Sequence, residues 1–441
     1  MLKVGFARVD ITPHIGASLK GYYRKRFAED VLDPLEINAV AFYDGNKKAL
    51  LITADNLGIV PSANKEFCEK IAKATGCDIE GIYLHCTHTH LAPAVCDFGI
   101  LGAPITEDDH EYVPWFTKRM IDVAVMAFSD LAPATGYYTN ANVDEVSFIR
   151  RFIMKDGTTR TNPGWQNPDI DHPIGTPDEL ATLIYFKRED EKEIAIAHFQ
   201  THPDTINGAK ISADWPGVVR RTYEKQIPNS KCICFVGAQG DTNHVDVRLP
   251  KEIGTGYRRT HYIGEKIALR LIANRPLAKK MEKDTVSYGV KTVSVEYNKG
   301  TKDEYTELLP IQKIFEKTGE LTCAVEGLGL EGMAATTIVA KACRVVNLMD
   351  REDKKDIMLS AVSVGDVVFA GIPGEPFTDV GRAIKDASPY KITLPTCCTN
   401  GYEGYFPTDF APGSYEASTC NFKSDTAQRI MAKMDELLKS I

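Results

Sequence analysis

Short apolar runs recur along the chain and alternate with longer stretches in which apolar residues return every three to four positions. An apolar run bounded by turn residues predicts a strand, and a spacing near 3.6 residues predicts a helix with one buried face. The runs that predict strands are AVAFYD, ALLITAD, GIYLHCT, ATLIYFK, EIAIAHF, CICFVGA, YGVKTVSVEY, DVVFAGIPG and YKITLP. The stretches that predict helices are SANKEFCEKIAKATG, YVPWFTKRMIDVAVMAFSDL, HYIGEKIALRLIANR and TAQRIMAKMDELLKSI. This alternation predicts an α/β fold. We expect mixed β-sheets layered with helices, because some strand pairs are close enough for antiparallel hairpins.

Two segments depart from this alternation. Residues 155–180 are rich in Gly, Pro, Asn and Asp and predict one long loop, and a loop of that length in a compact domain is often functional. Residues 301–350 predict mainly helices that cover one side of the protein. No linker divides the chain, so we expect a single domain over residues 1–441.

Composition narrows the classes of function. The 441 residues include 43% hydrophobic and 25% charged residues, as in an ordinary soluble globular protein. A net charge of −8 with both signs interspersed argues against nucleic-acid binding and against a polybasic membrane surface. No apolar run is long enough for a membrane-spanning helix, and the first residues lack the apolar core of a signal peptide. We therefore expect a cytoplasmic protein that acts on a small molecule, with formation of a homo-oligomer left open.

The eleven cysteines are scattered along the chain. An odd number without an export signal favours reduced thiols over disulfides. Cys232 and Cys234 lie close together, as do Cys397 and Cys398, but neither pair has a matching second pair. We expect these four to be buried free cysteines rather than metal ligands.

Three of the ten histidines fall within the stretch YLHCTHTHLAP. In an extended chain, residues two apart face the same way, so His88 and His90 would point into one cleft at the end of a strand while His85 points elsewhere. Open α/β sheets bind ligands at the carboxyl ends of their strands. On this pattern alone, a metal site and a pair of histidines that cap a strand are equally supported.

Three other predicted strands end in a polar turn that carries a candidate ligand or acid. His202 follows EIAIAHF, Glu375 follows DVVFAGIPG, and Asp241 lies in the Gly-rich turn after CICFVGA. His198 lies inside its strand and is expected in the core. Two imidazole nitrogens and one carboxylate suit Zn²⁺, which prefers N and O ligands in a tetrahedral shell. A catalytic site would keep one position open for water or substrate.

Seven motifs occur in the order found in the catalytic domain of neutral, non-lysosomal ceramidases, and the sequence resembles that family from about residue 4 to residue 420. The motifs are ARVDITP, THTH, THPDTINGAKISADWPG, GAQGD, IPGEPFTDVG, NGYEGY and SYEAST. Each is weak alone, whereas seven in the same order are specific for the superfamily, though not for the substrate. The resemblance implies a neutral-ceramidase catalytic-domain fold.

The resemblance also implies a metal site. In the family one zinc ion is bound by the first His of THTH, a His of the HP motif, the Glu of PGE and a Tyr of the NxYxxY stretch. These positions match His88, His202, Glu375 and Tyr405, which implies one Zn²⁺ per chain. Tyr405 is a candidate through the resemblance alone.

Substrate contacts follow from the same resemblance. His90, the second His of THTH, is implied to lie beside the metal and to contact the substrate. The family's substrate-binding arginine matches Arg150 of SFIRRF, with Arg151 as the alternative. Tyr415 of SYEAST matches a further substrate contact or oxyanion donor.

One motif departs from the family pattern. Ceramidases carry a nucleophilic serine in a GDxSPN turn, whereas this turn reads GDTNH and Asn243 stands at the position of the serine. Thr242 could take that role only if one residue had been lost. An amide cannot act as the nucleophile, so a serine mechanism is not expected. Compared with the family, the sequence is also expected to lack the C-terminal immunoglobulin-like domain and the secretion signal.

Without the serine, we expect zinc-bound hydroxide to attack an amide or ester carbonyl directly, since zinc can lower the pKa of bound water to about 7. His90 or Asp241 would act as the general base or acid. Arg150, Tyr405 or Tyr415 would stabilise the developing oxyanion.

The expected substrate is small, polar and sugar-like rather than membrane ceramide, because no apolar stretch indicates an entrance for an acyl chain. Asp214 begins the predicted helix DWPGVVRRTYEKQ and is either its N-cap or a substrate contact. Trp215, or Trp165 in the polar loop, could stack on a sugar ring. We count Asn243, Asp214 and Trp215 as the candidate substrate-binding residues.

Three alternatives remain open at this point. A zinc site with Tyr and His could instead run a lyase or isomerase reaction on a carbohydrate derivative. The amidohydrolase superfamily also uses HxH, but two strand-like runs precede the motif here and no lysine or aspartate stands at a matching strand end. A zinc-stabilised binding protein that has lost catalysis is the third.

Overall fold

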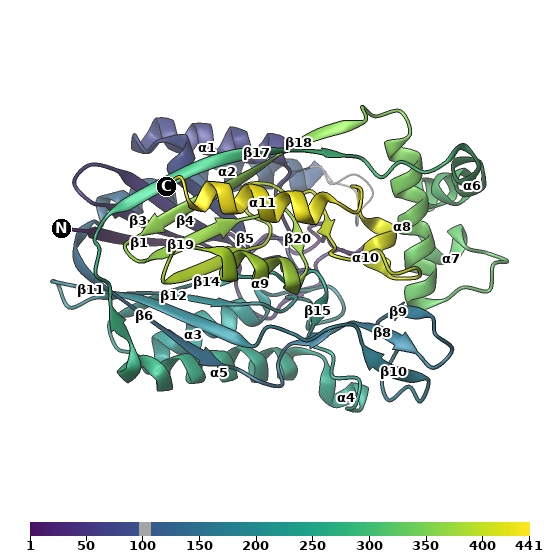
Figure 1. Ribbon diagram of the computed structural model, residues 1–441, viewed down its shortest axis with the longest axis horizontal. Helices are drawn as coiled ribbons and strands as arrows, with labels where there is room; N and C mark the ends of the chain where they lie inside the picture. Colours follow the sequence, from purple (N-terminus) through teal and green to yellow (C-terminus); the bar gives the residue numbers. More distant parts are fainter. Residues whose placement is uncertain (97–106) are drawn as a thin grey trace.

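Two β-sheets packed face to face form the centre of the fold, and helices cover the outer face of each sheet (Figure 1). The computed structural model describes residues 1–96 and 107–441. The layers alternate as helices, large sheet, small sheet and helices, and both sheets that form these layers contain parallel and antiparallel pairs. The predicted fold class, mixed sheets layered with helices, is confirmed. No helix within the described residues is long and apolar enough to cross a membrane.

The large sheet has nine strands in the described part of the chain. Their order is β14 (Ser230–Val236), β12 (Glu193–Phe199), β11 (Leu180–Arg188), β6 (Ala132–Asn142), β1 (Lys3–Asp10), β3 (Glu36–Tyr43), β4 (Lys48–Ala54) and β5 (Ile82–Cys86), with β16 (Lys279–Lys280) paired to β6. The sheet curls so that its first and last strands meet: the backbone N–H of Val236 donates to Nε2 of His85 over 3.1 Å. The rings of Tyr83 and Phe235 lie 6.1 Å apart at the same contact.

The small sheet packs inside this curl. Its order is β17 (Val286–Glu296), β18 (Lys354–Val364), β19 (Val367–Gly371) and β21 (Ile392–Thr396). Aromatic side chains from both sheets fill the space between them, including Phe42, Phe186, Phe235 and Phe369. Burial of apolar surface between the sheets fixes their relative position, since each such side chain contributes roughly 1.5–3 kcal/mol when fully buried.

Two groups of helices complete the outer layers. The large sheet is covered by α1 (Pro61–Thr75), α2 (Glu107–Ser129), α3 (Asp214–Gln226) and α5 (Tyr257–Asn274). The small sheet is covered by α9 (Thr378–Ala387) and α11 (Thr426–Leu438), which lie in front of the sheets in Figure 1. The apolar stripes that predicted helices at these positions are buried against the sheets.

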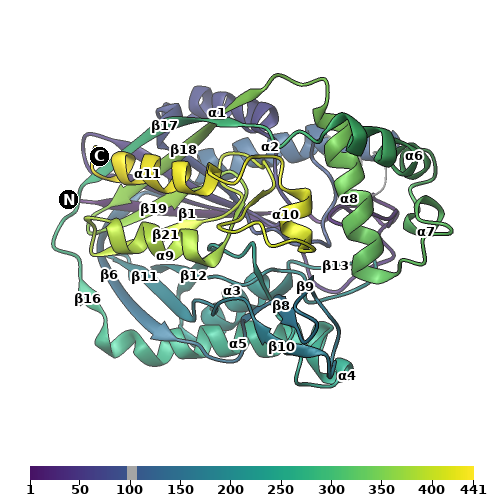
Figure 2. The ribbon, with the colours of Figure 1, turned by 45° about the vertical axis from the view of Figure 1, so that its right-hand side comes forward.

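The segment predicted as mainly helical, 301–350, contains α6 (Lys302–Thr318), α7 (Leu321–Ala324) and α8 (Gly332–Leu348). Figures 1 and 2 both place these helices at the end of the molecule opposite the two chain termini. Helix α8 begins next to α7 and packs against α6. The segment is therefore one helical unit with its own small apolar clusters.

Residues 155–180 do not form the single long loop that the sequence predicts. Part of it forms β9 (Thr159–Thr161) and β10 (Ile170–Pro173), which flank β8 (Arg151–Met154) in a small antiparallel sheet. Gly and Asn sit at its bends, including Gly157 and Asn162 with positive φ. The turn residues were read correctly as turns, but the short strands between them carry too few apolar residues to be recognised.

Several further elements of the fold are short. They are β2 (Asp30–Val31) with β13 (Lys210–Ile211), β7 (Phe148–Ile149) with β15 (Thr242–Asn243), β20 (Glu375–Pro376) with β22 (Tyr405–Phe406), and the helices α4 (Lys251–Gly254) and α10 (Tyr415–Thr419).

The turns after several strands of both sheets are joined by backbone hydrogen bonds at one end of the sandwich. The N–H of His88, after β5, donates to the carbonyl of Asn56, after β4, over 2.9 Å. The N–H of Cys397, after β21, donates to Val236 at the end of β14 over 3.1 Å. The N–H of Gly240 donates to Pro376 over 2.9 Å. Both sheets therefore contribute polar turns to one place.

Cysteine chemistry matches the sequence prediction. All eleven cysteines are free, and Cys232, Cys234, Cys397 and Cys398 are buried.

Two histidines lie buried between the sheets and outside the polar turns. Nδ1 of His85 lies 2.8 Å from the carbonyl of Cys397, and Nε2 of His198 lies 2.9 Å from the carbonyl of Pro395. Burial lowers the pKa of each to about 3, and neighbouring positive charge adds to the shift. Both are neutral core histidines, as expected for His198.

We expect stability to fall in acid because of these two side chains. In the unfolded chain each takes up a proton below about pH 6.5, whereas in the folded protein each stays neutral to about pH 3. Their contribution is fully present above pH 6.5 and is lost as the pH falls, by up to about 1.4 kcal/mol per pH unit for each histidine. In His198→Gln the free energy of unfolding, measured by urea titration between pH 7 and 4.5, should fall less steeply than in the parent. Equal slopes would contradict the assignment.

Candidate metal centre

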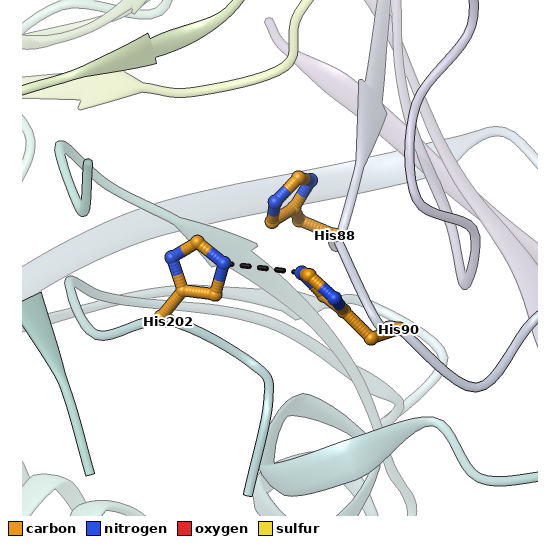
Figure 3. Close-up of side chains that lie close together, drawn as sticks. All are labelled: His88, His90 and His202. Carbon is orange, nitrogen blue, oxygen red and sulfur yellow. Dashed lines mark hydrogen bonds between the residues drawn. The ribbon is translucent and has the colours of Figure 1, made fainter. Parts of the chain in front are cut away.

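Three buried histidines meet where the polar turns converge (Figure 3). Nε2 of His90 lies 3.1 Å from Nε2 of His202, and the His88 ring lies 4.8 Å from that of His202 and 5.0 Å from that of His90, between centroids. Each offers one nitrogen, and these nitrogens all lie within 4.8 Å of one another. His88 and His90 come from the turn after β5, and His202 comes from the turn after β12.

The backbone of His88 is unusual and orients its ring. Its φ is +65°, a left-handed conformation that L-residues with bulky side chains rarely adopt. The THTH segment is thus a turn and not a continuation of the strand. Nδ1 of His88 lies 2.6 Å from the carbonyl of Leu57. A carbonyl can only accept, so Nδ1 carries a proton and Nε2 is the nitrogen left to face Glu375. Burial alone would lower the pKa of His88, but the charge of Glu375 raises it above its ordinary value.

Glu375 faces two of the three rings. Its Oε2 lies 3.4 Å from Nε2 of His88 and 3.7 Å from Nδ1 of His202. Its Oε1 accepts a 2.7 Å hydrogen bond from the hydroxyl of Tyr402. Burial alone would raise the pKa of Glu375, but His88, Tyr402 and Arg150 bring it below its ordinary value. Glu375 is therefore a carboxylate in this site.

These atoms fit a metal ion. Nε2 of His88 and Nδ1 of His202 are buried and neither makes a hydrogen bond within the described residues. Buried polar atoms are rarely left unpaired in a folded protein. Two ligand atoms on one tetrahedral zinc ion lie about 3.3–3.6 Å apart, given bonds of roughly 2.0–2.2 Å. The separations of 3.4 and 3.7 Å from Glu375 are close to this value.

Tyr405 lies beside Glu375. The short strands β20 and β22 pair in parallel with Glu375 opposite Tyr405. The Tyr405 ring also lies 5.8 Å from that of Tyr415, and the guanidinium carbon of Arg150 is 5.4 Å from its centroid. Burial and the charge of Glu375 raise the pKa of Tyr405 well above its ordinary value, so its phenol is protonated here. Four predicted ligands, His88, His202, Glu375 and Tyr405, are thus neighbours.

His90 occupies a place that the resemblance did not imply. It was predicted to contact the substrate beside the metal, and here it is the third member of the histidine cluster. Two ligand sets therefore share His88 and His202, one completed by Glu375 and Tyr405 and the other by His90. Burial lowers the pKa of His90 well below its ordinary value, with His88 and Arg26 adding to the shift. The ring is neutral in either case.

Of the two candidate arginines, Arg150 reaches the site. Its Nε donates to Glu416 over 2.6 Å, and a terminal nitrogen donates to the carbonyl of Gly240 over 2.7 Å. Arg151 instead binds Asp409 and stacks on Phe377.

Tyr415, the first residue of α10, lines the large cavity next to the three histidines and Glu375. Its backbone N–H donates to Oγ1 of Thr161 over 3.1 Å.

Asp241 and Thr242 of the GDTNH turn are both held by hydrogen bonds. Oδ1 of Asp241 accepts hydrogen bonds of 2.8 Å from both the backbone N–H and the hydroxyl of Thr378, which begins α9. Thr242 is fully buried and its hydroxyl donates to the carbonyl of Gln239. The carboxylate of Asp241 thus bonds the start of α9, and its role as general base or acid stays a prediction. Thr242 is unavailable as a nucleophile.

Asn243 lies beside the site rather than in it. Its amide nitrogen donates to Asn162 over 2.7 Å, and its oxygen accepts the N–H of Val245 over 2.9 Å. It lines a small side pocket next to His202.

Asp214 and Trp215 are absent from the lining of the cavity and of the side pocket, and their substrate contacts stay a prediction. The carboxylate of Asp214 accepts hydrogen bonds from the N–H and hydroxyl of Thr205 and from the N–H of Trp215. The Trp215 side chain is 0% exposed, and its indole N–H donates to the carbonyl of Thr201. Together they fasten α3 to the turn that carries His202. Trp165, by contrast, is half-buried in the wall of the side pocket.

Several neighbours of the site were missed. Tyr402 stacks on His88 with 5.8 Å between ring centroids, and Gln239 lies 3.3 Å from Oε2 of Glu375. Glu416 orients Arg150. All three lie in motifs already quoted, namely NGYEGY, GAQGD and SYEAST. The motifs therefore contained the signal, but sequence alone does not show which side chain of a motif faces the ligand.

A second missed group holds His90. The hydroxyl of Tyr22 donates to Asp204, and Arg26 lies over the Tyr22 ring, 4.1 Å from its centroid. Arg26 also donates to the backbone carbonyl of His90 over 2.7 Å. Burial raises the pKa of Asp204 to about 6, although Tyr22 and Arg26 oppose the shift.

The site opens into a cavity of about 1480 Å³. The histidines, Glu375 and the tyrosines lie on its inner wall, and α7 and α8 contribute part of the outer wall. Apolar residues of this outer wall include Leu321, Val325, Leu330, Met333, Ala335 and Ala340. The sequence showed no apolar entrance because these side chains are spread over two helices and a loop. The cavity wall thus combines the polar side chains of the candidate metal centre with apolar side chains of α7, α8 and the loop between them.

Tyr402→Phe should weaken metal binding about 10–100-fold, because partners that orient a metal-ligating side chain typically contribute that much. Phenylalanine keeps the ring beside His88 and removes only the hydroxyl that bonds Glu375. Competition with a chromophoric zinc chelator measures the affinity. Tyr43→Phe, whose hydroxyl bonds the exposed Gly45 carbonyl, is the control. Equal affinities in Tyr402→Phe and the parent would show that the hydroxyl does not support the ligand.

The sandwich of two mixed sheets layered with helices has the fold of the neutral ceramidases. The neutral ceramidase from Pseudomonas aeruginosa superposes with a TM-score of 0.73 at 15% identity, over 99% of this chain and 74% of that one. A structure described as ceramidase complexed with C2 gives a TM-score of 0.72 at 14% identity over the same shares. No protein-family model and no curated protein sequence matches this chain. The predicted ceramidase-like fold is confirmed, and the barrel of the amidohydrolase superfamily is ruled out.

Proposed function

We propose that this protein is a zinc-dependent hydrolase that cleaves an amide or ester bond in a small polar substrate. The observation that carries the proposal is the convergence of two unpaired buried imidazole nitrogens on one carboxylate oxygen, at 3.4 and 3.7 Å, beside a large cavity. His88, His202 and Glu375 would hold the ion, with Tyr405 or His90 as the fourth ligand. A bound zinc ion lowers the pKa of a coordinated water to about 7 and polarises a carbonyl oxygen.

The side chains around the ion suit acyl transfer to water. Arg150 is fixed by Glu416 and Gly240, and it lies over Tyr405. The phenol of Tyr415 is protonated, since burial raises its pKa, and Tyr405, whose pKa burial also raises, is a second such donor if His90 and not Tyr405 is the fourth ligand. These fixed donors can stabilise negative charge on a carbonyl oxygen, where one such donor typically contributes about 10²–10³-fold in rate.

Water is the nucleophile that the residues favour. Thr242 and Asn243 are held by other hydrogen bonds, so neither is placed to replace a catalytic serine. His90, if it is not a ligand, is a neutral imidazole close to the proposed ion and can accept a proton from the attacking water. General base catalysis of this kind typically contributes about 10²–10⁴-fold.

The test is a mass-resolved substrate panel on zinc-loaded protein in H₂¹⁸O. The panel contains N-acyl amino sugars, simple N-acyl amines and small esters, and the control is protein stripped by a chelator. Hydrolysis places one ¹⁸O in the released carboxylate, and activity should vanish on stripping and return with zinc. A product of unchanged mass would instead support the isomerase alternative, elimination without ¹⁸O the lyase alternative, and zinc binding without turnover of any substrate a binding protein.

A further inference from the structure

A second, smaller pocket of about 200 Å³ opens beside His202. Arg150, Asn162 and Asp204 line both this pocket and the large cavity, so the two are continuous. A cavity of only about 10–15 Å³ already accepts one water molecule, and this pocket therefore has room for a group of several heavy atoms. Neither the proposed metal ligands nor the acyl-transfer donors explain why it is polar.

His244 is the unexplained group in its wall. The side chain is 6% exposed, and neither ring nitrogen makes a hydrogen bond within the described residues. Burial, with Arg259 nearby, lowers its pKa to about 3. A neutral imidazole has one N–H donor and one acceptor nitrogen. His244 lines the pocket, so a molecule bound there can supply the partner that the imidazole lacks.

The other walls favour the same kind of occupant. Asn243 and Asn162 already bond each other, so their polar atoms are partly used. Asp204 adds an acceptor, and Arg150 and Lys251 add cations. The Trp165 ring rests against Gly254, where a Cβ would lie 2.1 Å from the indole, so the ring forms a fixed aromatic wall.

These features discriminate among ligand chemistries. A carboxylate or phosphate could pair with Arg150 and Lys251, but it would also meet Asp204 and the acceptor nitrogen of His244. An aliphatic group would leave both His244 nitrogens unpaired, which is unfavourable for buried polar atoms. A hydroxyl group both donates and accepts, so several hydroxyls on one ring can satisfy His244, Asp204 and Arg150 while the ring face packs on Trp165.

We propose that this pocket is a subsite for a polyhydroxylated ring, the sugar portion of the substrate, with His244 as its principal hydrogen-bonding residue. The proposal rests on the proposed function in one respect, namely that the scissile bond lies at the adjacent metal centre. It names the substrate class as N- or O-acylated sugars whose sugar part enters the side pocket while the acyl group extends into the large cavity.

The test measures binding separately from hydrolysis. N-Acetyl-D-glucosamine and N-acetylcyclohexylamine share the acyl group and ring size and differ in the hydroxyls. Calorimetric titration of each into zinc-loaded and metal-free protein compares the parent with His244→Leu and His244→Gln. His261→Leu, on the exposed surface of α5, is the control, and thermal unfolding shows that each variant is folded.

We expect His244→Leu to weaken binding of the sugar about tenfold or more, the usual scale for hydrogen bonds lost from a buried partner. His244→Gln, which keeps a donor and an acceptor, should restore most of the affinity, and the cyclohexyl analogue should bind all variants alike. Equal sugar binding by the parent and His244→Leu, or no sugar binding by the parent, overturns the subsite.

The two proposals fail differently. Sugar binding that depends on His244, without hydrolysis of any acyl substrate, would overturn the hydrolase and leave the subsite standing. Hydrolysis that is equally fast for both acetamides and unaffected by His244→Leu would do the reverse.

Discussion

The zinc content of the purified protein is expected to fall from about one ion per chain to background when His88 is replaced by alanine. His88 supplies an unpaired nitrogen 3.4 Å from Glu375, and its ring is held in place by the carbonyl of Leu57. Removing one of the protein ligands of a catalytic zinc ion leaves too few for a closed tetrahedral shell. Hydrolytic activity should fall with the metal, by more than about 10³-fold, since both the activated water and the polarised carbonyl depend on the ion.

Elemental analysis beside activity measures this, and His261→Ala on the exposed face of α5 is the matched control. His90→Ala separates the two ligand sets. If Glu375 and Tyr405 complete the shell, His90→Ala keeps the ion and loses activity only. If the three histidines bind the ion, His90→Ala loses metal as His88→Ala does. Unchanged zinc content in His88→Ala would remove the basis of the proposed function.

The largest effect on stability is expected from Arg220→Met. Arg220 and Asp55 are both fully buried and share two hydrogen bonds, of 3.0 and 2.6 Å. Burial raises the pKa of Asp55 even beside this arginine. Without Arg220 the buried Asp55 carboxylate keeps hydrogen bonds from Thr87 and the N–H of Glu36 but loses its cation. Removal of one partner of a buried ion pair typically costs 3–5 kcal/mol. We expect the free energy of unfolding, measured by urea titration, to drop by about that amount.

The control for this prediction is Arg429→Met on the surface of α11, where the pair with Asp425 is half exposed and should contribute no more than about 1 kcal/mol. The double variant Arg220→Met/Asp55→Leu should recover part of the loss, because an apolar pair of similar volume avoids the desolvation cost of the charges. A loss in Arg220→Met no larger than in Arg429→Met would mean that Asp55 is neutral or hydrated in the folded protein.

Much of the framework followed from the sequence because burial leaves a periodic signal. The run GIYLHCT predicted a strand, and β5 is fully buried over Ile82–Cys86. The polar residues at the ends of such runs, His88, His202 and Glu375, were predicted to meet. Oε2 of Glu375 lies 3.4 Å from Nε2 of His88 and 3.7 Å from Nδ1 of His202. Strand ends are constrained to one edge, so this level of the site is readable from a pattern.

The sequence did not predict the direction in which the side chains of the turns point. His88 and His90 share the cleft, but through a left-handed residue and not through the alternation of an extended chain. Asp241 and Trp215 lie in motifs that the family resemblance selected, yet one caps a helix and the other is core. Tyr402 was passed over although it bonds Glu375. A backbone φ and the packing of distant helices decide these cases, and neither leaves a local trace in the sequence.

The helical unit of α6, α7 and α8 also separates the chain into two sets of site residues. His88 and His202 precede it, whereas Glu375 and Tyr405 follow it, and residues 326–329 between α7 and α8 are exposed. A cut in that exposed loop would divide the ligands between two polypeptides, neither of which carries a complete shell. Zinc retention by the nicked protein would then report directly whether the two pieces stay associated.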